Sequence, residues 1–174
     1  MINRRNFLAL LSAVPPVCKA ALANAAEWHH FARELSRTLS NLKKHQFLIL
    51  EAQPPHYVQF VCEGSRGMRA ESVSNGYLQG ANRLSDEARS KVLKLGWNAP
   101  TIIPDPVSDR RGYDRHHGSP NYFLDFDPPV PHRFLANLAA STLHGVFGAQ
   151  HPRELRYTAF EKRGGNIDFA NLRR

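Results

Sequence analysis

The feature that most constrains this fold is a pair of strand-like segments joined by a short turn with glycine at both ends. Residues 57–63 alternate in character, with Val58, Phe60 and Cys62 on one side of an extended chain. Residues 68–74 are a second such segment, and Gly64-Ser65-Arg66-Gly67 separates the two. Because so short a turn joins only antiparallel strands, the sequence predicts a β-hairpin and an antiparallel sheet.

Other segments predict the rest of the sheet and its first helix. Residues 47–50 are a short apolar run ended by Pro54-Pro55, and residues 122–126 and 155–160 regain strand character. Apolar residues three or four apart predict a helix from about Glu27 to Lys43. The apolar face of this helix consists of Trp28, Phe31, Leu35, Leu39 and Leu42.

Two more helices are expected further along the chain. Ser85 is a good N-cap for the first, which Gly96 ends, so that Trp97 folds back as a hydrophobic contact. The second follows a proline-rich segment and contains Leu135 and Leu138. The resulting order, α-β-β-β-α-β-α-β, predicts the α+β class, with an antiparallel sheet of about five strands covered by helices.

The N-terminus has the three regions of an export signal. Its charged part is similar to a twin-arginine signal in Arg4, Arg5, Phe7 and Leu8. An apolar run and an A-x-A cleavage site, with alanines at Ala23 and Ala25, follow. The consecutive prolines Pro15 and Pro16 disfavour a structural helix here. We expect cleavage after Ala25 and export to the periplasm, the cell envelope or the medium; a cytoplasmic protein with a loose N-terminal extension is the alternative.

The remaining chain is predicted to be one domain with a loop insertion and a tail. Residues 1–25 are the expected signal, residues 26–163 the domain and residues 164–174 a polar basic tail. Residues 98–120 are rich in proline and charge and lack periodicity, which is typical of a long loop. No stretch approaches the roughly 20 apolar residues of a transmembrane helix.

Several strings in the predicted domain together resemble one family. They are Tyr57-Val58-Gln59-Phe60, Arg69-Ala70-Glu71-Ser72-Val73-Ser74-Asn75, Tyr77-Leu78, Leu95-Gly96-Trp97 and Pro120-Asn121-Tyr122. In these strings the chain resembles the TY-Chap domains, peptide-binding chaperones related to type III secretion chaperones (the CesT and YopN-chaperone group) and to YbjN. The resemblance implies a helix-and-sheet domain that binds a client polypeptide without enzymatic activity or a cofactor. It also implies a homodimer as one form to expect.

The residues expected to bind a peptide mix apolar bodies with polar tips, near a sheet edge or groove. They are Tyr57, Gln59, Glu71, Asn75, Tyr77, Trp97 and Tyr122. Purely structural roles remain open for several of them. Trp97 fits a core contact, Asn75 fits a turn that tolerates left-handed geometry, and Gln59 fits a cross-strand partner of Glu71. An envelope structural or protein-interaction domain that holds no peptide is therefore the second hypothesis.

No pattern of catalytic residues stands out. The histidines do not form the His-Glu-x-x-His spacing, and the chain has no Gly-x-Ser-x-Gly string or phosphate loop. Cys62 fits a small buried apolar residue. Five residues of types that can bind a metal lie in one loop, but a proline-rich loop does not fix ligand geometry. They are Asp105, Asp109, Asp114, His116 and His117. We therefore predict no catalytic, metal or cofactor site.

The net charge of +8 favours acidic partners or surfaces. Part of it lies in the expected signal, where Arg4, Arg5 and Lys19 have no acidic neighbour, so the remaining excess is mild. Arginines near the loop and the C-terminus permit weak nucleic-acid binding as a third hypothesis. We rank it last, because the aromatic residues alternate with apolar strand positions and are better explained as core.

Overall fold

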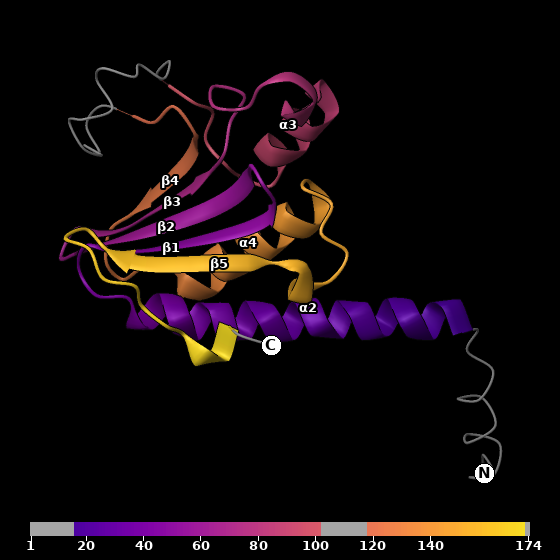
Figure 1. Cartoon of the computed structure of the whole chain (residues 1–174), viewed down its shortest axis with the longest axis horizontal. Helices are drawn as coiled ribbons and strands as arrows, with labels where there is room; N and C mark the ends of the chain where they lie inside the picture. The colour runs from indigo at the N-terminus through magenta and orange to yellow at the C-terminus, as the bar shows by residue number, and fades with distance from the viewer. Residues whose placement is uncertain (1–15, 102–117, 173–174) are drawn as a thin grey trace, which may run out of the picture.

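The protein is built around a five-stranded antiparallel sheet in the order β4-β3-β2-β1-β5 (Figure 1). A computed structural model describes residues 16–101 and 118–172. Its strands are β1 (Gln46–Gln53), β2 (His56–Gly64), β3 (Gly67–Ser72), β4 (Tyr122–Phe126) and β5 (Arg156–Glu161). The sheet packs against three helices, α2 (Pro16–Asn41), α3 (Asp86–Lys94) and α4 (His132–Gly145). The predicted α+β class is confirmed.

The β2–β3 hairpin forms where the alternating pattern predicted it. The two strands pair from Val58↔Ser72 to Gly64↔Gly67. Gly67 has a φ of 85°, and a Cβ there would lie 1.9 Å from the carbonyl oxygen of Phe126. Glycine is therefore required at this position both for its backbone conformation and for the close approach of β4.

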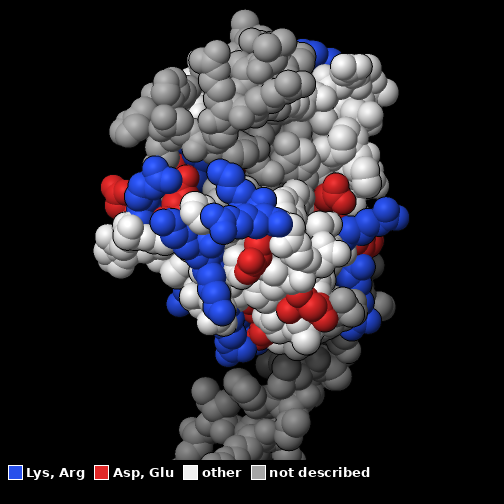
Figure 2. Space-filling view, turned by 60° about the vertical axis from the view of Figure 1, so that its left-hand side comes forward, with Lys and Arg blue, Asp and Glu red and all other residues white. Residues whose placement is uncertain are grey.

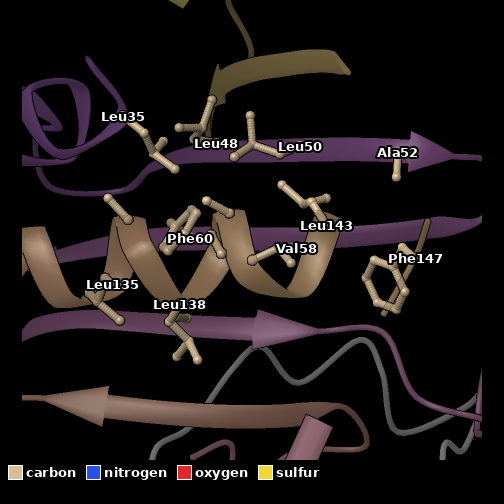
Figure 3. Packing of buried hydrophobic residues seen from close by; sticks show 14 of the residues in the cluster. Leu35, Leu48, Leu50, Ala52, Val58, Phe60, Leu135, Leu138, Leu143 and Phe147 are labelled. Atoms are coloured by element: carbon tan, nitrogen blue, oxygen red, sulfur yellow. The ribbon is translucent and has the colours of Figure 1, made fainter. Parts of the chain in front are cut away.

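The core lies between one face of the sheet and helices α2 and α4. Figure 1 shows both helices on the same side of the sheet. Figure 3 shows α4 in front of β1 and β2, with Leu35 of α2 approaching from the side. The most deeply buried residues shared by these elements include Leu35, Leu48, Leu50, Val58, Phe60, Leu135 and Leu143. Alternate residues of β1 and β2 supply this face, as expected for strands that are covered on one side.

Helix α2 differs from the prediction. It begins at Pro16 rather than near Glu27 and ends at Asn41. Pro15 lies outside the described residues. The expectation that Pro16 disfavours a helix here was wrong, because Pro16 occupies the first position of α2, where no N–H is needed for an intrahelical bond. Ala23 and Ala25 are exposed on this helix, and Arg4, Arg5, Phe7 and Leu8 lie outside the described residues. Export stays a prediction.

Helix α3 begins and ends as its sequence indicated. The hydroxyl of Ser85 accepts a hydrogen bond from the Ala88 N–H at 3.2 Å. Gly96 has a φ of 107°, and Trp97 behind it is 3% exposed. The N-cap, the glycine stop and the returning tryptophan are therefore confirmed.

The C-terminal tail is part of the fold rather than a loose extension. The Ile167 N–H donates to the Ala159 carbonyl at 2.8 Å, so the tail pairs with the outer edge of β5. Asn171 then donates to the hydroxyl of Thr38 on α2 at 2.8 Å. Within residues 16–101 and 118–172, no helix is long and apolar enough to cross a membrane.

Candidate functional site

The face of the sheet turned away from α2 and α4 carries two cross-strand rows of side chains. We call these ten residues the open face. The first row is Phe160, Phe47, Val61, Arg69 and Asp125, in order across the strands. The second row is Thr158, Ile49, Gln59, Glu71 and Phe123. The chemistry of the open face differs between the end formed by β5, β1 and β2 and the end formed by β3 and β4.

The apolar half of the open face consists of Phe47, Ile49, Val61 and Phe160. These four side chains are half-buried, and none belongs to the core cluster. The rings of Phe47 and Phe160 stack in parallel, with centroids 5.0 Å apart and an angle of 6° between their planes. Adjoining apolar side chains that a fold leaves partly in water are a typical contact surface for apolar groups of a partner.

The polar half of the open face consists of Gln59, Arg69, Glu71 and Asp125, and Arg69 is at its centre. Its side chain is 1% exposed, and its Nε and Nη2 atoms donate to the two carboxylate oxygens of Asp125, each at 2.8 Å. Its Nη1 atom donates to the carbonyl oxygen of Gly118 at 3.1 Å. The ring of Phe123 lies 5.5 Å from the guanidinium carbon. A buried charge needs this degree of pairing, so the arrangement stabilises the fold instead of offering a free cation.

Glu71 completes the polar half. It is 2% exposed and accepts hydrogen bonds from the amide of Gln59 and the hydroxyl of Ser119. Burial raises the pKa of Glu71, against the opposing effects of Ser119, Gln59 and the nearby charge of Arg69. The predicted cross-strand pairing of Gln59 with Glu71 is confirmed.

Three other expected peptide-binding residues hold structure together. Trp97 donates from Nε1 to the hydroxyl of Thr142 on α4 at 2.9 Å. Tyr122 is 4% exposed at the start of β4. The amide of Asn75 accepts from the Leu84 N–H at 2.7 Å and donates to the Leu84 carbonyl at 2.9 Å. Asn75 does not take a positive φ, so its turn role comes from this side-chain clamp rather than from left-handed geometry.

The seven expected residues do not meet in one place. Tyr57 and Gln59 are half-buried on β2, beside Glu71. Tyr77 is 38% exposed in the turn after β3, whereas Trp97 points to α4. Direct peptide contact by these residues stays a prediction, and the burial of Glu71, Trp97 and Tyr122 leaves their side chains little surface to offer.

The apolar half was missed because the sequence did not show which side of β1 is covered. Residues 47–50 form a continuous apolar run, which fits a strand buried on both faces. The available signal was the hairpin: an antiparallel sheet is often covered on one face only, so alternate residues of an apolar run then face outward. In β5 the same signal lay in Phe160, which is adjacent to the buried Ala159.

Both outer strands already pair with other parts of the chain. Asn98 and Phe123 exchange two backbone hydrogen bonds, of 3.1 Å and 3.2 Å, along the outer edge of β4. Residues 165–167 pair with β5 through bonds of 3.1 Å and 2.8 Å. A peptide that added itself as a sixth strand would have to displace these segments, so the structure favours contact through side chains of the sheet face.

Metal or thiol chemistry has little support in the described residues. In residues 16–101 and 118–172, no three His, Cys, Asp or Glu side chains are grouped to hold a metal ion. The crowded loop residues lie outside that part of the chain, namely Asp105, Asp109, Asp114, His116 and His117. Cys62 is a free cysteine, half-buried against the core, in keeping with the apolar role expected of it.

Comparison with known proteins gives one match. The family model described as TY-Chap3, "T3SS (YopN, CesT) and YbjN peptide-binding chaperone 3", matches residues 21–161. This range contains α3, α4, all five strands and most of α2. Searches of curated proteins and of solved structures gave no match.

Proposed function

Because the chain belongs to the TY-Chap3 family of peptide-binding chaperones, we propose that it holds segments of another polypeptide on the apolar half of its open face. The family is non-catalytic. A holding function needs only a surface that binds and releases, whereas catalysis would need reactive groups poised over a substrate.

One observation carries this proposal: four adjoining apolar side chains lie outside the core and keep part of their surface in water. Covering such surface releases roughly 25 cal/mol per Å² of apolar area. A partner with apolar side chains would therefore gain binding energy from Phe47, Ile49, Val61 and Phe160. Because Asn98 and residues 165–167 occupy the outer strands, side-chain capture is favoured over strand addition.

The proposal is tested with a fluorescently labelled polypeptide that is kept unfolded by reduction and alkylation. The double variant Phe47→Ser with Ile49→Ser replaces two of the four side chains of the apolar half. We expect it to bind the polypeptide about tenfold more weakly by anisotropy, because about 1.4 kcal/mol of apolar contact corresponds to that factor.

The matched control is Leu93→Ser on α3, which is not part of the sheet and where the side chain is 46% exposed. It removes a comparable exposed apolar group and should leave the affinity unchanged. Circular dichroism shows whether each variant is folded. Equal loss in the control and the double variant, or no binding by the unaltered protein, contradicts the proposal and favours a structural or interaction domain without peptide holding.

We further propose that residues 1–25 direct export and are then removed. The support is the Arg4-Arg5-Asn6-Phe7-Leu8 string and the position of the alanines. Ala23 and Ala25 are exposed, and Trp28 is the first buried residue among the described side chains, so cleavage after Ala25 leaves the core complete. Mass spectrometry of the protein from fractionated cells should find an N-terminus at Ala26 outside the cytoplasm. Changing Arg4 and Arg5 together to Lys should keep the full-length chain in the cytoplasm; unchanged export would contradict this.

A further inference from the structure

Five exposed cations gather at one end of the sheet, beside the apolar half. We call them the basic rim; they are Lys43, Lys44, Arg66, Lys162 and Arg163. They lie in three turns: between α2 and β1, between β2 and β3, and after β5. Figure 2 brings this end of the molecule forward and shows Lys and Arg side chains concentrated there.

Backbone hydrogen bonds hold these turns together. The His45 N–H donates to the Cys62 carbonyl at 2.7 Å, which joins the first turn to β2. The Lys162 N–H donates to the His45 carbonyl at 3.0 Å, which joins the end of β5 to the same turn. The basic rim is therefore a fixed feature of the fold and not a chance meeting of long side chains.

The ion pairs of the described residues do not include the basic rim. Among residues 16–101 and 118–172, the ion pairs involve Arg37, Arg69, Arg89 and Lys91, and none involves a member of the rim. Among the described residues, the acids at this end include the buried Glu63, the exposed Asp127, and Glu161, which accepts a hydrogen bond from the Gln46 amide. In the described part of the chain, the five cations of the rim outnumber the exposed carboxylates of Asp127 and Glu161, which favours a positive local potential.

The basic rim continues directly from the apolar half. Lys162 follows Phe160 by two residues, and Lys44 precedes Phe47 by three. Phe47 pairs with Phe160, and the Lys162 N–H donates to the His45 carbonyl, so the first and third turns adjoin this pair of phenylalanines. One extended partner segment can therefore touch the stacked phenylalanines and the cations at the same time.

We infer that the client segment is amphipathic and acidic, with apolar residues on the apolar half and adjoining Asp or Glu residues on the basic rim. This inference rests on the proposed function and adds to it the chemical class of the client. A polypeptide fits this surface better than a nucleic acid does. Ile49 and Val61 offer no ring on which a base can stack, and the rings of Phe47 and Phe160 already stack on each other.

The test uses two labelled peptides that share one apolar segment, one flanked by glutamates and the other by lysines. At low salt we expect the full chain to bind the acidic peptide about tenfold more tightly, and salt to reduce the difference. The triple variant Lys44→Gln, Arg66→Gln and Lys162→Gln should abolish this preference. The control triple Lys91→Gln, Lys94→Gln and Arg153→Gln removes the same charge from exposed positions elsewhere and should keep it.

The outcomes separate this inference from the proposed function. Equal affinity for both peptides, weakened in each case by Phe47→Ser with Ile49→Ser, overturns the acidic preference and leaves peptide holding intact. Binding of neither peptide overturns both. Labelled single-stranded DNA is the third probe: tighter binding of DNA than of the acidic peptide, lost in the rim triple variant, would overturn the inference in favour of a nucleic-acid partner.

Discussion

The two halves of the open face lie in the same two cross-strand rows, yet they reverse the usual distribution of polarity. In the polar half the charged side chains of Arg69 and Glu71 are buried, at most 2% exposed. The apolar half, including Phe47 and Ile49, keeps part of its surface in water. Side-chain chemistry alone therefore does not locate a binding surface. Charged groups that have partners within the chain stabilise the fold, whereas apolar groups outside the core are available to contact a client.

The partners of the buried charges in the polar half come from segments far apart in the sequence. Arg69 on β3 pairs with Asp125 on β4, and Gly118 and Ser119 supply further hydrogen-bond partners. Breaking such a buried network leaves unpaired charge, which is costly. Truncating a half-buried apolar side chain costs much less stability. The two halves should therefore respond to mutation in opposite ways, one in stability and the other in binding.

The largest expected effect is that of Arg69→Ala. It leaves the buried Glu71 and the half-buried Asp125 without their cation, so we expect the free energy of unfolding to fall by about 3–5 kcal/mol, measured by urea denaturation. Phe47→Ser, the comparison variant from the apolar half, should lose about 1 kcal/mol or less. Similar losses in the two variants would break the contrast between the halves.

Trp97→Phe should have an intermediate effect. It removes the buried hydrogen bond to Thr142, whose loss should lower the free energy of unfolding by about 1–3 kcal/mol. Its affinity for unfolded polypeptide should match that of the unaltered protein once both are folded. A selective loss of binding without loss of stability would restore Trp97 to the binding surface.

Glu71→Gln tests the polar half through pH. Burial raises the pKa of Glu71 in the folded protein above its ordinary value of 4.5, so the unfolded chain releases this proton more easily. The contribution of Glu71 to stability is therefore fully present below pH 4.5 and is lost as pH rises through the folded-state pKa. Glu71→Gln should remove this decline in urea unfolding measured at several pH values.

The control for this pH test is Glu87→Gln on the surface of α3. Lys91 lowers the pKa of Glu87, so its small contribution has the opposite sign and is lost as pH falls. An unchanged pH profile in Glu71→Gln would show that Glu71 does not titrate as a buried group.

The smallest effect on stability is expected from the basic rim. Changing Lys44, Arg66 and Lys162 together to Gln should alter the free energy of unfolding by no more than about 0.5 kcal/mol per site, because the side chains are exposed and have no ion pairs in the described part of the chain. Thermal unfolding followed by circular dichroism checks this. A large loss would mean that the rim stabilises the fold.

Local patterns predicted much of the fold. The glycines at residues 64 and 67 identified the β2–β3 hairpin, and Ser85 with Gly96 bounded α3, because turns and caps depend on residues close in sequence. The start of α2 was predicted wrongly, since a proline that breaks a helix interior is favoured at its first position. The docking of the tail through Asn171 could not be predicted, because it depends on tertiary contact with Thr38.

The candidate site was harder to predict than the fold. Polar-tipped residues were chosen as binding residues, but the partners of Glu71 and Trp97 are Ser119 and Thr142, which lie 48 and 45 positions away in the chain. Only the folded structure shows that these groups are already satisfied. It also shows which residues of the 47–50 run face away from the helices.

Photo-crosslinking to the labelled unfolded polypeptide tests most directly whether the apolar half is the client-binding surface. Benzoylphenylalanine is placed at Ile49 on the apolar half or, as the control, at Leu93 on α3. We expect a strong crosslink from position 49, competed away by unlabelled polypeptide, and none above background from position 93. A crosslink from position 93 alone, or equal crosslinks from both positions, would contradict the assignment of the apolar half as the client-binding surface.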